Sequence, residues 1–188
     1  GSTLINWTLI FSYTGTRKET NNWSVTWPAL QQGHNYVSVR SSDIAGNTTA
    51  YVDVFYLKKD TLAPTITKNS TWGETTTYFR VDPGTIFDVD FQDSTSLLDT
   101  GQYRICTQPN GSNEIIGWTN IYTNANVATY TNNWALTAGH FTTLINGGTN
   151  YVSVRCWDNA GSTSTITDCF KIFKDTQLPR IVPLLSGA

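Results

Sequence analysis

Nearly the same sequence occurs twice in this chain of 188 residues. The stretch "NYVSVRSSDIAGN" begins at Asn35, and "NYVSVRCWDNAGS" begins at Asn150, 115 residues later. The match extends outward in both directions, with a shift of 111 residues before an insertion near "AGHFTTLI" and of 115 residues after it. The matched pairs are Trp7 and Trp118, Trp23 and Trp134, Gly33 and Gly148, Tyr36 and Tyr151, Asp43 and Asp158, Gly46 and Gly161, Asp60 and Asp175, and Pro64 and Pro179. A repeat of about 115 residues therefore decides the architecture.

Alternating apolar and polar residues predict β-strands throughout this repeat. Val37 and Val39 share one face of "NYVSVR", and Phe87, Val89 and Phe91 share one face of "IFDVDFQD". The segments "WSVTW" and "WALTA" alternate in the same way. Gly, Asn, Asp and Pro clusters separate such segments at intervals of about ten residues, which is typical of antiparallel sandwiches. We expect an all-β fold without a long helix.

The ends of the two repeats resemble bacterial immunoglobulin-like (fibronectin-III-like) repeats of cell-surface proteins. In those repeats a strand ends in Asp-x-Ala-Gly-Asn, a hairpin follows, and a Lys-Asp-Thr-x-x-Pro linker opens the next domain. Here "VRSSDIAGN" precedes "KKDTLAPT", and "VRCWDNAGS" precedes "FKDTQLPR". The segment "FQDSTSLLDTGQYRI" is similar to an earlier part of such repeats. The resemblance implies tandem immunoglobulin-like β-sandwiches that serve as stalks, adhesin segments, filament or coat subunits, or spacers of secreted enzymes.

The repeat is out of phase with the chain. Residues 62–176 match a complete sandwich, residues 1–61 match only the C-terminal part of one, and residues 177–188 match the first strand of a following repeat or a donor strand. An incomplete sandwich exposes an apolar face and unpaired strand edges. Three explanations remain open: a window on a longer repeat chain, a filament subunit completed by strands of a neighbouring copy, or a small first domain that closes by itself.

Composition and sequons favour an extracellular or cell-surface location. Charged residues form only 14% of the chain, against about 25% in ordinary domains. The net charge of −2 argues against nucleic acid as a partner, and no apolar run is long enough to insert into a membrane. Adjacent repeats or identical subunits, joined through strand edges, are the expected partners, with glycans as a further class. Five glycosylation candidates occur: Asn6, Asn22, Asn47, Asn69 and Asn110.

The three cysteines cannot all pair within one chain. Cys156 and Cys169 flank a predicted hairpin, so a disulfide between them is one interpretation. Buried free thiols, including Cys106, are the other. Metal binding by the cysteines is not expected, because no second Cys or His follows at zinc-site spacing.

Catalysis finds little support in the sequence. The two histidines, His34 and His140, stand beside glycines in predicted loops, where they are poorly placed to act as a held base. No catalytic residue and no cofactor are therefore assigned, and the chain is not expected to be an enzyme. Calcium is left open, because carboxylates in linkers and loop ends could gather at domain junctions. Its candidates are Asp43, Asp60, Asp158 and Asp175, with turn capping as the alternative role.

The tryptophans divide into two classes. Those that repeat, Trp7 with Trp118 and Trp23 with Trp134, are predicted to belong mainly to the core. Those that do not repeat are candidates for a platform that stacks on sugar rings: Trp27, Trp72 and Trp157. The sequence thus favours a non-catalytic extracellular structural repeat protein. The alternative is a carbohydrate-binding or accessory module of a secreted enzyme.

Overall fold

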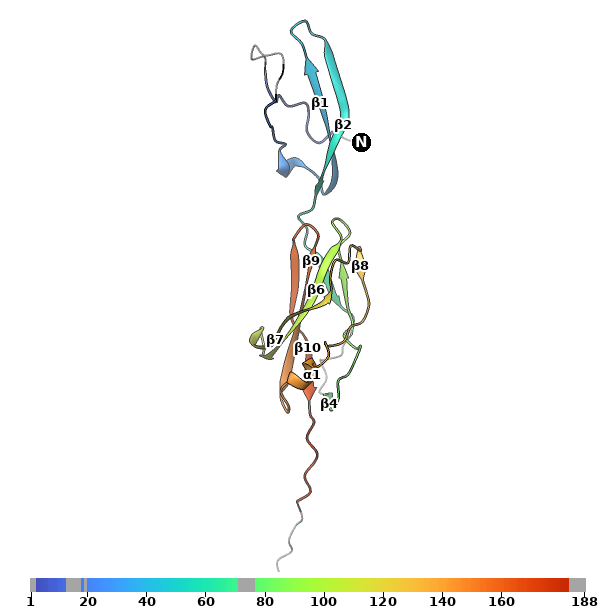
Figure 1. Cartoon of the computed structure of the whole chain (residues 1–188), viewed down its shortest axis with the longest axis vertical. Coiled ribbons are helices and arrows are strands. Elements are labelled where there is room, and N and C mark those ends of the chain that lie inside the picture. Colours follow the sequence, from blue (N-terminus) through green and yellow to red (C-terminus); the bar gives the residue numbers. More distant parts are fainter. Residues whose placement is uncertain (1–2, 13–17, 19, 71–76, 183–188) are drawn as a thin grey trace, which may run out of the picture. The chain divides into compact units, whose positions relative to one another are not determined.

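The computed structural model describes residues 3–12, 18, 20–70 and 77–182, and the chain divides into two units, Gly1–Thr61 and Leu62–Ala188 (Figure 1). Nearly all regular structure is β. Within the described ranges, no helix has both the length and the apolar character needed to cross a membrane.

The first unit contains one hairpin. Strands β1 (Gly33–Ser42) and β2 (Thr48–Lys59) pair antiparallel around a turn in which the Asp43 N–H donates to the Asn47 carbonyl. A short 3-10 turn, η1 (Trp27–Ala29), precedes them. The strand predicted for "WSVTW" is therefore wrong, because Trp23 to Thr26 are irregular and Pro28 favours the first turn of a helix over a strand interior.

The second unit contains two sheets. The five-stranded sheet has the order β4-β10-β9-β6-β7, and the three-stranded sheet has the order β3-β5-β8. All neighbouring strands are antiparallel except β4 and β10, which are parallel. The elements are β3 (Thr65–Lys68), β4 (Tyr78–Phe79), β5 (Val89–Gln92), β6 (Leu98–Gln108), β7 (Ser112–Tyr122), β8 (Thr129–Tyr130), α1 (His140–Thr143), β9 (Thr149–Asp158) and β10 (Thr163–Lys174).

The core of the second unit draws side chains from both sheets. Phe87, Val89 and Phe91 are at most 1% exposed, so the predicted apolar face of this segment is confirmed. Their partners come from β6, β9 and β10: Tyr103, Ile105, Val152, Val154, Phe170 and Ile172. This arrangement is consistent with a β-sandwich. The strand predicted for "WALTA" reduces to a single bridge between Trp134 and Phe87, whose rings stack with centroids 4.3 Å apart.

The two hairpins, β1–β2 and β9–β10, share the same irregularity. Asp53 and Asp168 each have a φ of 54°, and a register shift interrupts the strand pairing beside each of them. The Asp53 N–H donates to Ser38 Oγ at 3.1 Å, and the Asp168 N–H donates to Ser153 Oγ at 3.0 Å. A serine hydroxyl therefore satisfies the amide that each bulge removes from the ladder.

Each hairpin is also tied to the chain before it by a buried lysine. Lys174 is 8% exposed, and its Nζ donates to the carbonyls of Thr142 and Leu144 at 2.8 and 3.1 Å. Lys59 is equally buried and donates to the Leu30 carbonyl at 2.8 Å. Carbonyls at the end of a short helical turn lack partners within it, so the ammonium group supplies them.

Replacing this lysine tests its role in the second unit. We expect Lys174→Met to lower the free energy of unfolding by about 1–3 kcal/mol, because two carbonyls lose their buried donor. Lys171→Met, on an exposed position of the same strand, should change it by less than about 0.5 kcal/mol. Urea denaturation measures both. Equal effects of the two substitutions would contradict the assignment.

Candidate interaction surface

The β1–β2 hairpin exposes side chains whose counterparts in β9–β10 are buried. Val54 and Phe55 are 50% and 39% exposed. The residues 115 positions later, Cys169 and Phe170, are 5% and 0% exposed. Val39 is half-buried, whereas its counterpart Val154 is fully buried. The same strand sequence therefore meets a covering sheet in the second unit and none among the described residues of the first.

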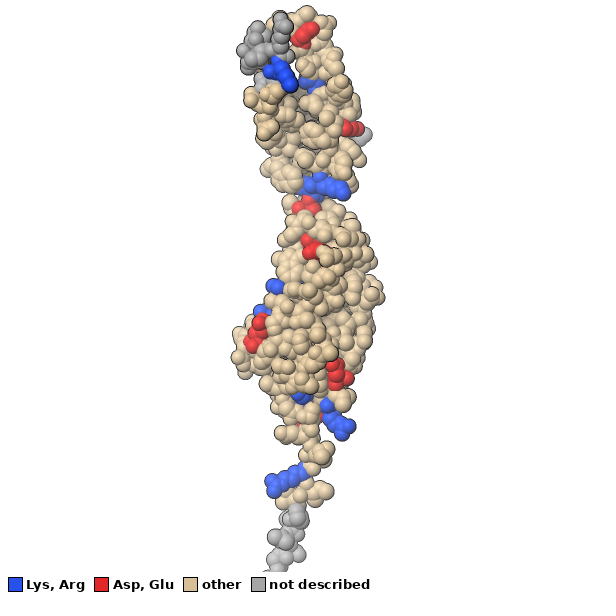
Figure 2. Space-filling model, viewed as in Figure 1, with Lys and Arg blue, Asp and Glu red and all other residues tan. Residues whose placement is uncertain are grey.

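The first unit exposes many large apolar side chains. Figure 2 shows isolated charged side chains on a surface that is otherwise uncharged. On the hairpin, the rings of Tyr36 and Tyr56 lie 6.4 Å apart, and Trp23 contacts Phe55 with centroids 5.8 Å apart. The side of the hairpin that carries Val54 and Phe55 is called the hairpin face. The exposed large apolar residues of the hairpin and of the segments before it are Leu4, Ile5, Trp7, Leu9, Ile10, Phe11, Trp23, Tyr36, Tyr51, Val52, Val54, Phe55 and Tyr56. Exposed apolar side chains in such numbers are typical of an interaction surface.

The backbone edge of β1 is also open. In the second unit, β9 pairs with β10 on one side and with β6 on the other, where Val154 faces Tyr103 and Val152 faces Ile105. In the first unit, β1 pairs only with β2 within the described residues. Unpaired N–H and C=O groups along such an edge are a template for another strand.

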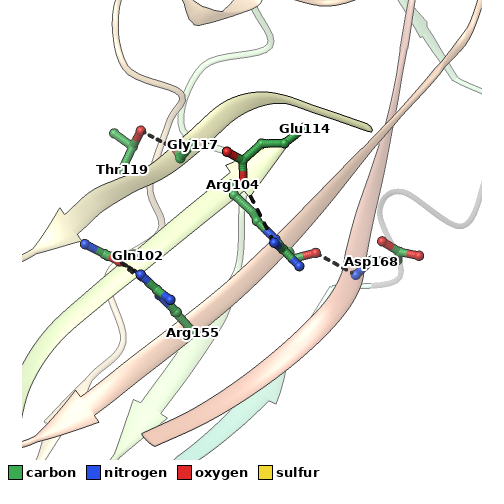
Figure 3. Close-up of polar contacts among 8 residues, drawn as sticks. Gln102, Arg104, Glu114, Gly117, Thr119, Arg155 and Asp168 are labelled. Carbon is green, nitrogen blue, oxygen red and sulfur yellow. Dashed lines mark hydrogen bonds and ion pairs between the residues drawn. The ribbon is translucent and has the colours of Figure 1, made fainter. Parts of the chain in front are cut away.

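The outer face of the five-stranded sheet carries a stack of arginine and tryptophan. The Arg155 guanidinium carbon lies 4.0 Å from the ring centre of Trp118 and 4.3 Å from that of Trp157. Its Nε and Nη2 donate to Gln102 Oε1 at 3.0 and 2.8 Å (Figure 3). Burial, together with the neighbouring Arg104, lowers the pKa of Arg155. Among the described residues of the first unit, Arg40 makes such a contact, 4.5 Å from the Trp7 ring centre.

This stack corrects part of the tryptophan prediction. Trp134 is 6% exposed and belongs to the core, as predicted. Trp7 and Trp23 are 51% and 39% exposed, and Trp118 is half-buried on the outer face. Trp118 repeats with Trp7 because each ring stacks on an arginine that also repeats, so the core prediction for this pair is wrong.

The three platform candidates are not brought together. Trp27 is 45% exposed in the first unit, and Trp157 is half-buried in the second. Trp72 lies outside the described residues. The Arg155 guanidinium covers one face of the Trp157 ring, which removes that face from stacking on a sugar.

The calcium candidates are in different environments. Asp43 is exposed, and its two oxygens accept from the Asn47 N–H and Nδ2 at 2.8 and 2.7 Å, which lowers its pKa. Asp175 is exposed and caps a turn through the Gln177 N–H. Asp60 follows β2 and is half-buried. Asp158 is only 2% exposed.

A carboxylate that the sequence analysis left out lies beside Asp158. Asp93 is 6% exposed, and a carboxylate oxygen of Asp93 lies within 4.8 Å of one of Asp158. In sequence Asp93 follows Phe87, Val89 and Phe91 at alternate positions, so it continues the face that is buried and not the face of Asp88 and Asp90. The "DSTS" that it opens is a second signal, because Asp followed by small polar residues favours a turn that its side chain caps.

The histidines are not the loop residues that the sequence predicted. His34 lies within β1, and its ring lies 5.4 Å from that of Tyr56. His140 is the first residue of α1, and its Nδ1 lies 2.7 Å from the hydroxyl of the buried Tyr103. The second unit also has two open hollows of about 400 Å³, one lined by Arg80, Asp82, Phe141 and Lys174, the other by Pro64, Ile66, Ser164 and Ile166.

The glycosylation candidates are all on the surface. Exposed side chains are found at Asn6, Asn22, Asn47, Asn69 and Asn110. Two of these side chains make polar contacts. Asn47 Nδ2 donates to Asp43, and Asn69 Nδ2 donates to Asp88 Oδ1 at 3.2 Å.

Of the two interpretations of the cysteines, the structure has buried free thiols at Cys106, Cys156 and Cys169 and no disulfide between Cys156 and Cys169. The strand register explains this, because Cys156 faces Ser164 whereas Cys169 lies beyond the bulge, next to Phe170. The two side chains therefore stand at separate points along the hairpin. Burial raises the pKa of Cys169 to about 11 and that of Cys156 to about 12.

These thiols should resist alkylation in the folded chain. The thiolate is the reactive form, and at pH 8 fewer than about one in a hundred of the Cys156 and Cys169 thiols is ionised, while burial also raises the pKa of Cys106. We expect almost no labelling by iodoacetamide at pH 8, and three labelled thiols per chain in guanidinium without reductant. Fewer than three labelled thiols under the denaturing condition would indicate a disulfide.

Comparison with known proteins adds no family to this description. Neither a scan against protein-family models nor a search of curated proteins finds a match to this sequence. The functional argument therefore depends on the surfaces of the chain itself.

Proposed function

We propose that this chain is a non-catalytic structural repeat protein of the cell surface or extracellular space. In this proposal, residues 1–61 are one part of an immunoglobulin-like sandwich, and strands with the pattern of residues 62–117 cover the hairpin face. The observation that carries the proposal is the exposure of Val54 and Phe55 where Cys169 and Phe170 are buried.

The shared details of the two hairpins support their being copies of one module. Both have an aspartate bulge capped by a serine hydroxyl, and both have a lysine buried against a preceding helical turn. Asn35 and Asn150 are also both buried, and each amide bonds to a carbonyl of the second strand, Leu57 or Ile172. A sequence that keeps these buried polar contacts is adapted to a fully packed module.

The second unit indicates the chemistry of the missing cover. There, β5 places Val89 and Phe91 against the core, and β6 both pairs with β9 and buries Tyr103 and Ile105. An occupant of the hairpin face therefore needs an amphipathic strand like β5 and an edge-pairing strand like β6. Backbone pairing gives such a contact its affinity, and the alternate side chains give it specificity.

A structural role follows from this kind of contact. A repeat chain that joins its modules through strand edges and short linkers holds position, extends reach or packs into a filament or coat. The five exposed sequons suit a secreted surface that sugars keep soluble. Neighbouring copies or neighbouring repeats are the partners in this proposal, and glycans are the class that attaches to the surface.

A chain with a completed first module tests the proposal. Because Trp7 corresponds to Trp118, a second copy of residues 62–117 placed directly before Trp7 restores the full repeat length. In the chain of residues 1–188, we expect the amides of β1 and β2 to exchange rapidly with solvent. In the completed chain they should exchange at least about 100-fold more slowly, because both edges and the apolar face are then covered.

The matched control carries Phe87→Asp and Phe91→Asp in the added copy only, which removes its apolar face but keeps its length. This control should leave β1 and β2 unprotected. Slow exchange of β1 and β2 in monomeric residues 1–188 would contradict the proposal, and so would equal protection in the completed and control chains. Hydrogen exchange read by mass spectrometry measures all three chains.

A further inference from the structure

Two carboxylates of the second unit are buried side by side. Asp93 follows β5, Asp158 ends β9, and their side-chain oxygens lie within 4.8 Å of one another. Within the described part of the chain, no lysine or arginine forms an ion pair with either of them. Two carboxylates this close repel each other when both are ionised, and a cation between them would relieve that repulsion.

Each aspartate uses one oxygen to hold its own loop. Asp93 Oδ1 accepts from the N–H groups of Thr95, Ser96 and Leu97 at 2.9–3.0 Å. Asp158 Oδ1 accepts from Ala160 and Ser162 at 2.9 and 2.8 Å. These hydrogen bonds fix each carboxylate against its own loop through one of its two oxygens.

The second oxygen of Asp158 has no such ligand among the described residues. Asp158 Oδ2 is buried without a hydrogen-bond partner there, and so is Ser96 Oγ in the loop that Asp93 holds. Asn159 joins the two loops, because its N–H donates to the Leu97 carbonyl at 3.0 Å and its Nδ2 donates to the Ser96 carbonyl at 2.9 Å. Asp158 Oδ2 and Ser96 Oγ, two unpartnered buried oxygens in adjoining loops, are therefore available as ligands for a cation.

In the corresponding turn of the first unit, the second carboxylate oxygen has a hydrogen-bond donor. There, Asn47 donates its side-chain Nδ2 to Asp43 Oδ2 at 2.7 Å. The residue 115 positions later is Ser162, which has no side-chain amide to donate to Asp158 Oδ2. One difference between the repeats, asparagine against serine, therefore leaves the second oxygen of Asp158 open.

We propose that Asp93 and Asp158 bind a divalent cation of the size of calcium, with Ser96 Oγ as a neutral ligand. Calcium suits the donor set because it takes carboxylate, hydroxyl and carbonyl oxygens and completes its shell with water. The cation would bridge the loop after β5 and the loop after β9, and these two strands belong to different sheets. It would hold this end of the sandwich closed.

Calcium titration of the full chain, by calorimetry and by thermal unfolding, tests this site. We expect one calcium ion per chain at this site and a rise in Tm when calcium is added. Asp158→Asn keeps the Oδ1 acceptor and should weaken calcium binding at least tenfold. Ser162→Asn is the sharper variant, because it copies the first unit and supplies an amide to Asp158 Oδ2; it should weaken calcium binding to the same extent.

Two matched variants serve as controls. Asp43→Asn removes an exposed carboxylate at the same place in the other repeat, and Asp175→Asn removes an exposed turn cap. Both should keep the affinity of the wild-type chain for calcium. The absence of calcium binding by the wild-type chain would overturn the proposal. It would also be overturned if folded Ser162→Asn bound calcium with unchanged affinity, since the ion would then lie elsewhere.

Discussion

The burial of one face of a β-hairpin against a second sheet is the interaction on which the rest of this structure depends. In the second unit, β9 and β10 bury Val152, Val154 and Phe170 completely, and the aromatic layer of Phe87 and Trp134 packs on them. At about 25 cal/mol per Å² of apolar surface, a few such side chains account for several kcal/mol. Among its described residues, the first unit has the same hairpin without the same cover.

Buried polar groups make this packing specific. An apolar hairpin could slide along its partner, but Asn150 accepts the Ile145 N–H and donates to the Ile172 carbonyl, and Lys174 reaches two carbonyls before β9. Each of these contacts is satisfied in only one register, because a shift by one residue would leave the groups buried without partners. The hairpin β1–β2 has the same two contacts, from Asn35 to the Leu57 carbonyl and from Lys59 to the Leu30 carbonyl. The exposed hairpin therefore has the same strand register as the packed one.

Alternation in the sequence predicted the strands that have one buried face, including the segment of Phe87, Val89 and Phe91. It failed where tertiary contacts override local pattern. "WSVTW" alternates but is followed by Pro28, which belongs to a 3-10 turn. Trp118 on β7 stacks on Arg155 of β9, two strands away in the same sheet, and this contact is not visible in the local sequence. The pairing of Asp93 with Asp158 could not be predicted, because the two residues are 65 positions apart and meet only when both sheets are assembled. The sequence left the cysteines open between a disulfide and free thiols, because the bulge that changes the register between β9 and β10 is visible only in the structure.

The absence of a disulfide between β9 and β10 has a mechanical consequence. When a load pulls on the two ends of this module, no covalent link limits how far it lengthens. Once the ladder between the strands shears, the whole repeat can unravel to a contour length on the order of 400 Å. Rupture would also uncover Cys156 and Cys169, which then become chemical markers of a module that has been stretched open.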